Sequence, residues 1–222
     1  MKDLKDRVVV ITGSDTGIGR ESAFLCADEG ARLVITYHQQ AHDGEETARR
    51  CLDRGAADTL VFPLDVCSPE SIERVLEQVK DRFGAIDVLV NNAGVITWKH
   101  LRDQSLQEIR QQIEVNLTGL ITMTKLSLPL IRESVINISS GSGKHGFENL
   151  TAYCATKFGV RGFTQALAKE TALKIFSVNP PLTKTRMSGY EGVPVEHVAR
   201  YVVDTIKQAD VIESGSDVDV PR

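Results

Sequence analysis

Residues 12–23 read TGSDTGIGRESA and place glycines at positions 13, 17 and 19. This stretch follows the apolar run 8–11 and leads into a helical pattern at 18–29. A turn this tight needs residues without a Cβ, so that backbone N–H groups face a pyrophosphate at the start of the helix. The stretch therefore predicts a strand, a phosphate-binding loop and a helix in succession; the alternative is a glycine turn with only a structural role.

The same order of strand and helix recurs along the chain. Short apolar runs rich in branched residues, each typical of a buried strand, lie at residues 8–11, 33–35, 60–62, 88–90, 135–138 and 175–178, with a last short one at 218–220. Helical patterns lie at 18–29, 44–54, 69–83, 105–131, 153–173 and 194–208. This alternation predicts an α/β fold: a single doubly wound domain over residues 1–222, with a parallel sheet covered by helices on both faces.

Composition excludes several classes of function. Lys and Arg total 26 against 30 for Asp and Glu, a net charge of −4, so no basic surplus attracts nucleic acid. The four cysteines are scattered without a C-x-x-C pair, which argues against a metal site or a disulfide framework. Neither a secretion signal nor a membrane-spanning run of about 20 apolar residues is visible. We expect a cytoplasmic protein that has no metal and no membrane partner.

The glycine spacing T-G-x-x-x-G-I-G resembles that of the classical short-chain dehydrogenase/reductase family. Further patterns follow in the family's order, so the resemblance covers nearly the whole chain: PLDV with Asp65, NNAG at 91–94, and Y-x-x-x-K at Tyr153 and Lys157. The resemblance implies a Rossmann-type domain that binds a nicotinamide dinucleotide, with Asp65 contacting adenine; by itself, Asp65 is equally a turn or capping residue.

Tyr153 and Lys157 are four residues apart on a predicted helix, so they face one ligand. A free tyrosine titrates near pH 10, and a neighbouring cation stabilises its phenolate. The resemblance implies that Tyr153 gives its proton to a carbonyl in reduction and removes it from an alcohol in oxidation. It also implies that Lys157 holds the nicotinamide ribose hydroxyls.

Two further residues complete the predicted catalytic set. Ser140, in VINISSGSG, lies 13 residues before Tyr153, the separation seen in the family, and is preferred over Ser139 as the hydroxyl that binds the substrate oxygen. Asn116, in EVNLTG, matches the family's asparagine that opens the long helix and holds a water in a proton relay. Taken alone, the two are a strand-capping serine and a helix-packing asparagine.

The cofactor type is predicted from the end of the second strand, in GARLVITYHQQ at residues 30–40. NAD-specific family members carry an acid there that binds the ribose hydroxyls, but this chain has Tyr37 and His38. The usual basic residue is also missing at Thr16, and Arg20 either approaches the phosphate or lies on the helix surface. We predict that NADP is preferred and that NAD is possible.

Downstream, the chain departs from the family pattern. The family's P-G-x-x-x-T is here Pro180-Pro181-Leu182-Thr183-Lys184-Thr185, and Pro181 lacks the N–H and the freedom of glycine. The substrate region that follows is shortened, with only MSGYEG at 187–192 before the next helix. The following residues either line the substrate site or pack within loops: Met187, Tyr190, Trp98, His145 and Phe147. The full set of predicted cofactor contacts is Gly13, Asp15, Thr16, Gly17, Ile18, Gly19, Tyr37, His38, Asp65, Val66, Asn92, Ala93, Gly94, Tyr153, Lys157, Pro180, Leu182, Thr183 and Thr185.

The sequence thus predicts an oxidoreductase that interconverts an alcohol and a carbonyl compound with a nicotinamide cofactor. The resemblance is spread over reductases of 3-oxoacyl carriers, sugar dehydrogenases and small-ketone reductases. A catalytically silent dinucleotide-binding sensor or scaffold is the alternative. A hydrolase built on His145 is rejected, because no G-x-S-x-G elbow occurs. The helical stretches 105–131 and 153–173 resemble the pair through which family members form homodimers and homotetramers.

Overall fold

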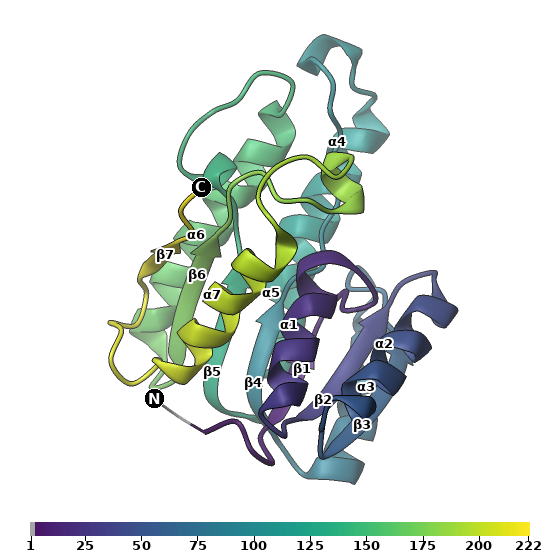
Figure 1. Ribbon diagram of the computed structural model, residues 1–222. Coiled ribbons are helices and arrows are strands. Elements are labelled where there is room, and N and C mark those ends of the chain that lie inside the picture. Colours follow the sequence, from purple (N-terminus) through teal and green to yellow (C-terminus); the bar gives the residue numbers. More distant parts are fainter. Residues whose placement is uncertain (1–2) are drawn as a thin grey trace.

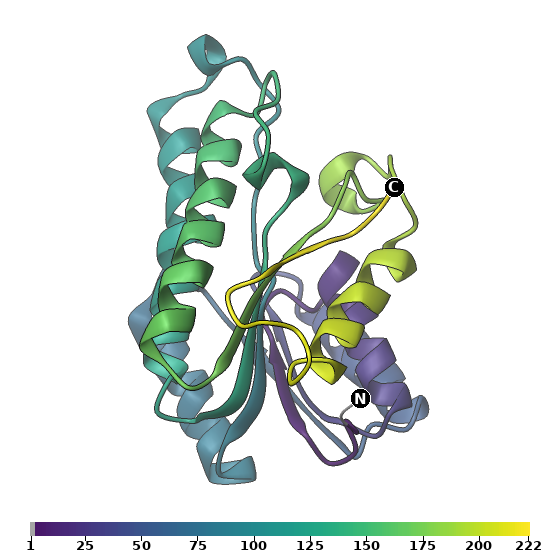
Figure 2. The ribbon, with the colours of Figure 1, turned by 90° about the vertical axis from the view of Figure 1, so that its left-hand side faces the viewer.

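A seven-stranded sheet lies between two layers of helices in the computed structural model, which describes residues 3–222 (Figures 1 and 2). The strands are β1 (Val8–Ile11), β2 (Arg32–Tyr37), β3 (Asp58–Pro63), β4 (Ile86–Asn91), β5 (Ile131–Ile138), β6 (Lys174–Asn179) and β7 (Asp217–Asp219). Every neighbouring pair is parallel, in the order β3-β2-β1-β4-β5-β6-β7. The order reverses between β1 and β4, and this switch point is where doubly wound sheets bind ligands.

The helices are α1 (Gly17–Asp28), α2 (Ala41–Asp53), α3 (Pro69–Phe83), α4 (Leu106–Ile113), α5 (Leu120–Ser127), α6 (Thr151–Glu170) and α7 (Val195–Lys207). Figure 2 shows α1 and α7 on one side of the sheet and α6 on the other. Helix α3 illustrates how the sequence sets a helix boundary. The Ser68 hydroxyl accepts a hydrogen bond from the Ser71 N–H, Pro69 occupies the first turn, and Gly84 ends the helix in the left-handed conformation.

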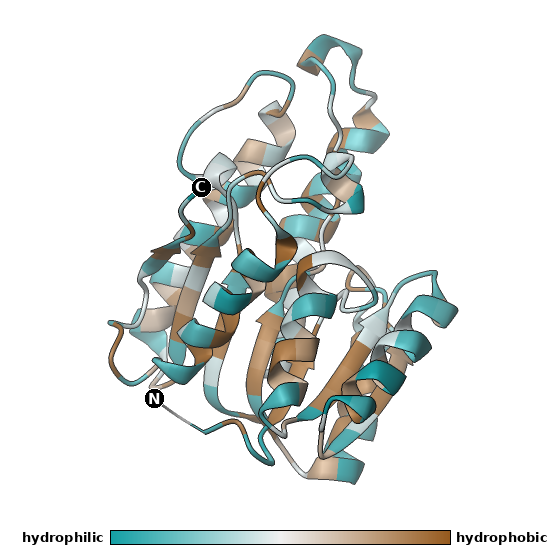
Figure 3. Ribbon diagram, viewed as in Figure 1, coloured by the Kyte–Doolittle hydropathy of each residue, from teal (hydrophilic) through white to brown (hydrophobic). Residues whose placement is uncertain are grey.

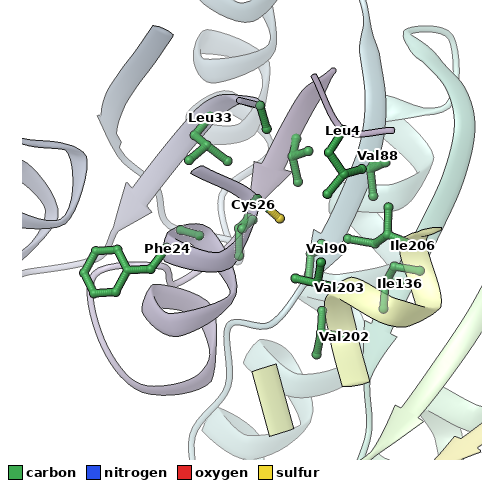
Figure 4. Close-up of a cluster of buried hydrophobic side chains, with 14 of the residues drawn as sticks. Leu4, Phe24, Cys26, Leu33, Val88, Val90, Ile136, Val202, Val203 and Ile206 are labelled. Carbon is green, nitrogen blue, oxygen red and sulfur yellow. The ribbon is translucent and has the colours of Figure 1, made fainter. Parts of the chain in front are cut away.

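Each face of the sheet has its own apolar core, and the strands carry the hydrophobic residues of both (Figure 3). Strands β1 and β4 are buried along their whole length, as expected for parallel strands covered on both faces. On the face shown in Figure 4, Val90 and Ile136 of the sheet lie near Val202, Val203 and Ile206 of α7. The predicted alternation and the doubly wound fold are confirmed.

The predicted helix at 105–131 is wrong in detail. Helix α4 is followed by a π-helical segment, Glu114–Gly119, and then by α5, and Ile131 already belongs to β5. The Asn116 amide bonds to the backbone of Val95 on the neighbouring loop, which holds the widened turn in place. The last strand also starts one residue earlier than predicted, at Asp217, whose carboxylate pairs with Arg161.

Within residues 3–222, no helix combines the length and the apolar character needed to cross a bilayer.

Candidate active site

The glycine-rich turn between β1 and α1 has the conformation that its sequence predicts. Gly13 has a φ of +62° and Gly17 a φ of +57°, values that strain any residue with a Cβ. A Cβ on Gly19 would lie 2.5 Å from both the Asn92 amide nitrogen and the Gly13 carbonyl oxygen. Gly13 and Gly17 therefore shape the turn, whereas Gly19 lets α1 approach the end of β4.

The N-terminus of α1 is suited to an anion. Its N-cap residue, Thr16, makes no side-chain capping bond, and the first turn carries no acidic side chain. The backbone N–H groups at a helix start lack intrahelical partners and carry partial positive charge. A pyrophosphate would satisfy them, so the residues present fit a dinucleotide.

The ends of β1 and β4 are bonded together at the switch point. The Thr12 hydroxyl oxygen accepts hydrogen bonds from the backbone N–H groups of Asn92 and Ala93, at 2.9 and 3.0 Å. In return, the Asn92 side-chain amide donates to the carbonyl oxygens of Thr12 and Gly13. The NNAG segment thus supports the glycine turn. Sequence reasoning missed the part played by Thr12.

Ser140, Tyr153 and Lys157 are brought together by β5 and the first two turns of α6. Ser140 follows the end of β5 and caps a short turn, Gly141–Gly143, with its hydroxyl oxygen accepting from the Ser142 N–H at 3.1 Å. Tyr153 and Lys157 are 8% and 4% exposed. The Lys157 ammonium donates to the Ile138 carbonyl oxygen at 2.8 Å and lies 5.6 Å from the centroid of the Tyr153 ring.

Burial controls the protonation of this pair. Burial raises the pKa of Tyr153 to about 12, and a hydrogen bond with Ser140 acts in the opposite direction. Burial lowers the pKa of Lys157 to about 8, because the ammonium loses water without gaining an anion. Burial therefore decides the pKa of Tyr153 in this arrangement, and the only opposing contribution comes from Ser140 rather than from Lys157 as expected. Tyr153 is protonated at neutral pH.

The neighbouring Ser139 has a different environment from Ser140. Its hydroxyl donates to the Lys157 backbone carbonyl oxygen at 3.1 Å. A Cβ on Gly143 would lie 2.6 Å from the Ser139 oxygen and 2.7 Å from the Lys157 carbonyl oxygen. These contacts bind the end of β5 to α6, so Ser139 is engaged inside the protein. The geometry supports Ser140 as the hydroxyl available to a substrate.

Asn116 lies behind the cavity wall and is 1% exposed. Its side-chain oxygen accepts from the Val95 N–H at 2.7 Å, and its amide donates to the Val95 carbonyl oxygen at 2.8 Å and to the Thr156 hydroxyl at 3.3 Å. Thr156 is the residue before Lys157 on α6. Asn116 therefore connects the π-helical segment, the loop after β4 and the catalytic helix.

Near the end of β2, the cavity wall carries Tyr37 and His38, the residues predicted to face adenosine. The Tyr37 ring packs so closely on Gly44 that a Cβ there would lie 2.7 Å from its Cδ1 atom. Asp65 also lines the wall, while one of its carboxylate oxygens accepts from the Cys67 N–H at 2.9 Å. Asp65 is thus both a turn residue and a wall residue, and Ser68, not Asp65, caps α3.

Beside the catalytic groups, the Pro-Pro segment after β6 remains well anchored. The Gly141 N–H donates to the Pro180 carbonyl oxygen at 2.9 Å, and the Thr183 hydroxyl donates to the Pro181 carbonyl oxygen at 2.8 Å. Thr183 also forms an isolated β-bridge with Val193. The side chain of Thr185 faces Gly17, because a Cβ there would lie 3.4 Å from its methyl carbon. Pro181 is therefore accommodated in a closed loop beside the glycine turn.

All these groups surround one cavity of about 1240 Å³. Pockets for a single small molecule measure about 300–1,000 Å³, so this one has room for a dinucleotide and a second molecule.

Of the predicted site residues, all but Gly19 and Asn116 line this cavity. Trp98, His145, Phe147 and Met187 line it as well, whereas Tyr190 is 65% exposed and interacts with Arg186. Lining residues that the sequence did not single out include Gln39, Gln40, Ile96, Gln111 and Asn179.

No cluster of three or more potential metal ligands occurs in the described part of the chain.

Comparison with known proteins agrees with this geometry. The family model described as "short chain dehydrogenase" matches residues 7–193. "Uncharacterized oxidoreductase YhdF" of Bacillus subtilis (strain 168) is 34% identical over 227 aligned positions, covering 90% of this chain and 77% of that protein. "Dehydrogenase/reductase SDR family member 7" of Homo sapiens is 36% identical, covering 77% of this chain and 52% of that protein.

Solved structures show the same fold. The crystal structure of levodione reductase superimposes with a TM-score of 0.91 at 23% identity, over 98% of this chain and 96% of that one. A dehydrogenase/reductase from Sinorhizobium meliloti 1021 also gives a TM-score of 0.91, at 20% identity. The strand order and the glycine turn define a doubly wound α/β protein. The chain belongs to the short-chain dehydrogenase family of oxidoreductases.

Proposed function

We propose that this protein is an NAD(P)-dependent oxidoreductase that interconverts an alcohol and a ketone or aldehyde. One observation carries the proposal. The Ser140 and Tyr153 hydroxyls and the Lys157 ammonium share a cavity with the glycine turn and the free N-terminus of α1. A silent binding module has no need of two hydroxyls and a buried cation beside its dinucleotide site.

In this mechanism the cofactor, when bound, supplies or accepts the hydride. Tyr153 donates its hydroxyl proton to the substrate carbonyl oxygen in reduction and takes a proton from the alcohol in oxidation. Ser140 donates a hydrogen bond to the same oxygen and stabilises the charge that develops there. Because the pKa of Tyr153 is raised to about 12, the free enzyme holds the proton that reduction requires.

Lys157 supports both groups. Its ammonium, near the Tyr153 ring, favours the phenolate that forms when the proton leaves. We assign to the same ammonium the binding of the ribose hydroxyls of the nicotinamide half. Asn116 holds the loop after β4 against α6, next to Lys157. We assign to it the water-mediated proton relay that the family resemblance implies.

For the cofactor, we propose NADP with NAD as a weaker alternative. No acid stands at Tyr37 or His38 to repel a 2′-phosphate. Arg186 lines the cavity and is exposed, and it contacts Asp43 at 3.4 Å and Tyr190, surface interactions that a phosphate can replace. Arg20, by contrast, is bonded to the Asp15 carbonyl oxygen and the Thr47 hydroxyl and is occupied within the loop.

Titration with NADPH and with NADH, followed by nicotinamide fluorescence, tests the proposal. We expect both to bind, with NADPH tighter by tenfold or more, about 1.4 kcal/mol. Equal or tighter binding of NADH would contradict the proposed preference for NADP but leave the oxidoreductase proposal standing. Absence of binding by either cofactor would overturn the enzyme proposal. Tight binding without turnover across ketones, sugars and thioesters would favour the sensor.

We also propose a homodimer or homotetramer in the cytoplasm. Three helices expose large apolar side chains to solvent. These are Leu106 and Ile113 of α4, Ile121 of α5 and Phe158 of α6. Helices α4 and α6 pack against each other, so a second copy could cover this face. Light scattering that shows only a monomer at micromolar concentration would contradict the assembly. All four cysteines are free thiols, in keeping with a reducing compartment.

A further inference from the structure

The rim of the cavity beyond Ser140 and Tyr153 is built from large apolar side chains. Trp98, Phe147, Leu182 and Met187 line the cavity while 42–50% of each remains exposed, the most exposed being Trp98 at 50%. They come from three loops far apart in the chain, after β4, after β5 and after β6. Exposed apolar groups gathered at one opening are characteristic of a surface that binds an apolar partner.

Trp98 is fixed so that its ring, not its polar atom, is available. The indole N–H donates to the Met187 carbonyl oxygen at 3.3 Å, joining the loop after β4 to the segment after β6. The hydrogen-bonding need of the indole is thus met inside the protein. A second, smaller cavity of about 360 Å³ adjoins the first and shares Trp98, Leu182 and Met187 as walls. The apolar surface therefore continues past the indole.

The floor behind the rim is also apolar. Ile96 packs on a small buried cluster formed by Leu150, Tyr153 and Cys154. A substrate whose carbonyl oxygen lies between Ser140 and Tyr153 has this cluster beside it. A sugar would place several hydroxyls against these walls, and each hydroxyl without a partner costs about 1–3 kcal/mol.

Some basic side chains near the opening are paired with carboxylates, whereas Arg186 and Arg222 also line the cavity. Lys144 contacts Asp219 at 2.5 Å, and Lys99 contacts Glu108 at 2.5 Å. His100 lies 3.8 Å from Glu148. An acyl carrier or a coenzyme A thioester needs cations that are free to meet its phosphates. The pairings of Lys144 and Lys99 occupy two of the cations that such a substrate would use near this opening.

We infer that the substrate is an uncharged, apolar ketone, or the matching secondary alcohol, whose ring or branched chain lies against Trp98 and Phe147. This inference rests on the proposed function and narrows it. The carbonyl reaches Ser140 and Tyr153, and the apolar group occupies the space bounded by the loops after β4, β5 and β6. Of the three reaction types that the sequence left open, the geometry points to the reduction of small ketones.

Steady-state kinetics with the tighter-binding cofactor test this substrate class. The probes are phenylacetone, 2-butanone, acetoacetyl-CoA and, with the oxidised cofactor, D-glucose. We expect kcat/KM for phenylacetone to exceed that of each other compound by tenfold or more. A higher value for D-glucose or acetoacetyl-CoA would overturn the inference and leave the oxidoreductase proposal standing. Failure of phenylacetone to react while cofactor binds would also overturn it, whereas failure of cofactor binding would overturn the proposed function itself.

Variants of Trp98 separate recognition from folding. We expect Trp98→Ala to lower kcat/KM for phenylacetone about tenfold, mainly through KM, and to leave 2-butanone within twofold. Trp98→Phe keeps an aromatic face and should retain most of the activity. Leu52→Ala, at a side chain of similar exposure (49%) on α2, is the matched control. Equal losses for phenylacetone and 2-butanone in Trp98→Ala would show a structural role and contradict substrate recognition.

Discussion

The proposed catalytic wall and the proposed substrate rim of the same cavity are built in opposite ways. On the wall, Tyr153 and Lys157 are almost fully buried and held by regular elements, a strand end and a helix. On the rim, Trp98 and Phe147 are half exposed and lie on loops. A buried wall fixes protonation states and distances, which the chemical step requires. The apolar side chains of the rim lie on loops, and they select which substrate reaches that wall.

The largest expected effect comes from removing the proton donor of the wall. Tyr153→Phe deletes the hydroxyl and keeps the buried ring, so the fold and the cofactor site remain. Because general acid–base catalysis contributes about 10²–10⁴-fold, we expect kcat to fall by that factor. Stopped-flow and steady-state assays measure the loss, and nicotinamide fluorescence measures cofactor binding. Near wild-type turnover in this variant would refute the assignment of Tyr153.

The same contrast explains what the sequence could predict. Tyr153 and Lys157 are one helical turn apart on α6, so the helical period puts them on one face. Ser140 was predicted only from its separation from Tyr153 in the family it resembles, because the irregular segment 144–150 lies between the Gly141–Gly143 turn and α6. The glycine turn was equally predictable, because its φ values need glycine. By contrast, the Trp98–Met187 hydrogen bond joins residues 89 positions apart, and no local pattern predicts it.

The π-helical segment and Arg161 show the same limit. Apolar periodicity runs through residues 105–131, and only the packing of Asn116 on Val95 shows where the helix widens. Arg161 looks like an ordinary surface residue of α6 in the sequence. Its contact with Asp217 spans 56 positions and depends on how β7 joins the sheet. Long-range pairing of this kind follows from the assembled fold.

The burial of Lys157 in the wall can also be tested through its effect on the free energy of unfolding. Its pKa is about 8 in the folded protein against an ordinary value of 10.5, because burial disfavours the ammonium. This difference corresponds to about 3 kcal/mol of destabilisation at neutral pH. We therefore expect Lys157→Met to be more stable than the wild type at pH 7, by up to that amount, while losing catalytic activity.

The pH dependence of this effect has a definite sign. Between pH 8 and about 10.5 the unfolded chain binds more protons at this lysine than the folded protein does. Wild-type stability at this site therefore rises with pH across that window, and the advantage of Lys157→Met fades. Urea unfolding at pH 7 and pH 10 measures it, with Lys80→Met on the exposed face of α3 as control. A variant less stable than wild type at pH 7 would show that the ammonium's bond to Ile138 outweighs its desolvation.

The smallest expected effect concerns the junction between wall and rim, where Arg161 holds the Ser140 turn. Its guanidinium donates to the Gly143 carbonyl oxygen at 2.6 Å and to both Asp217 carboxylate oxygens at 3.0 Å. These bonds hold the pKa of Asp217 near 2, so the pairing persists at any working pH. We expect Arg161→Met to lower kcat about tenfold without changing cofactor binding, and Arg161→Lys to recover part of the loss.

A double-mutant cycle with Ser140→Ala decides whether Arg161 acts through the serine. If it positions Ser140, then Ser140→Ala costs clearly less in the Arg161→Met background than in the wild type, because the hydroxyl is already displaced. Additive losses would mean that Arg161 serves only stability. Arg49→Met is the matched control, since Arg49 also bridges carboxylates but lies on the exposed face of α2. A coupling found only for Arg161 would show that its bond to the Gly143 carbonyl oxygen positions Ser140 for the reaction.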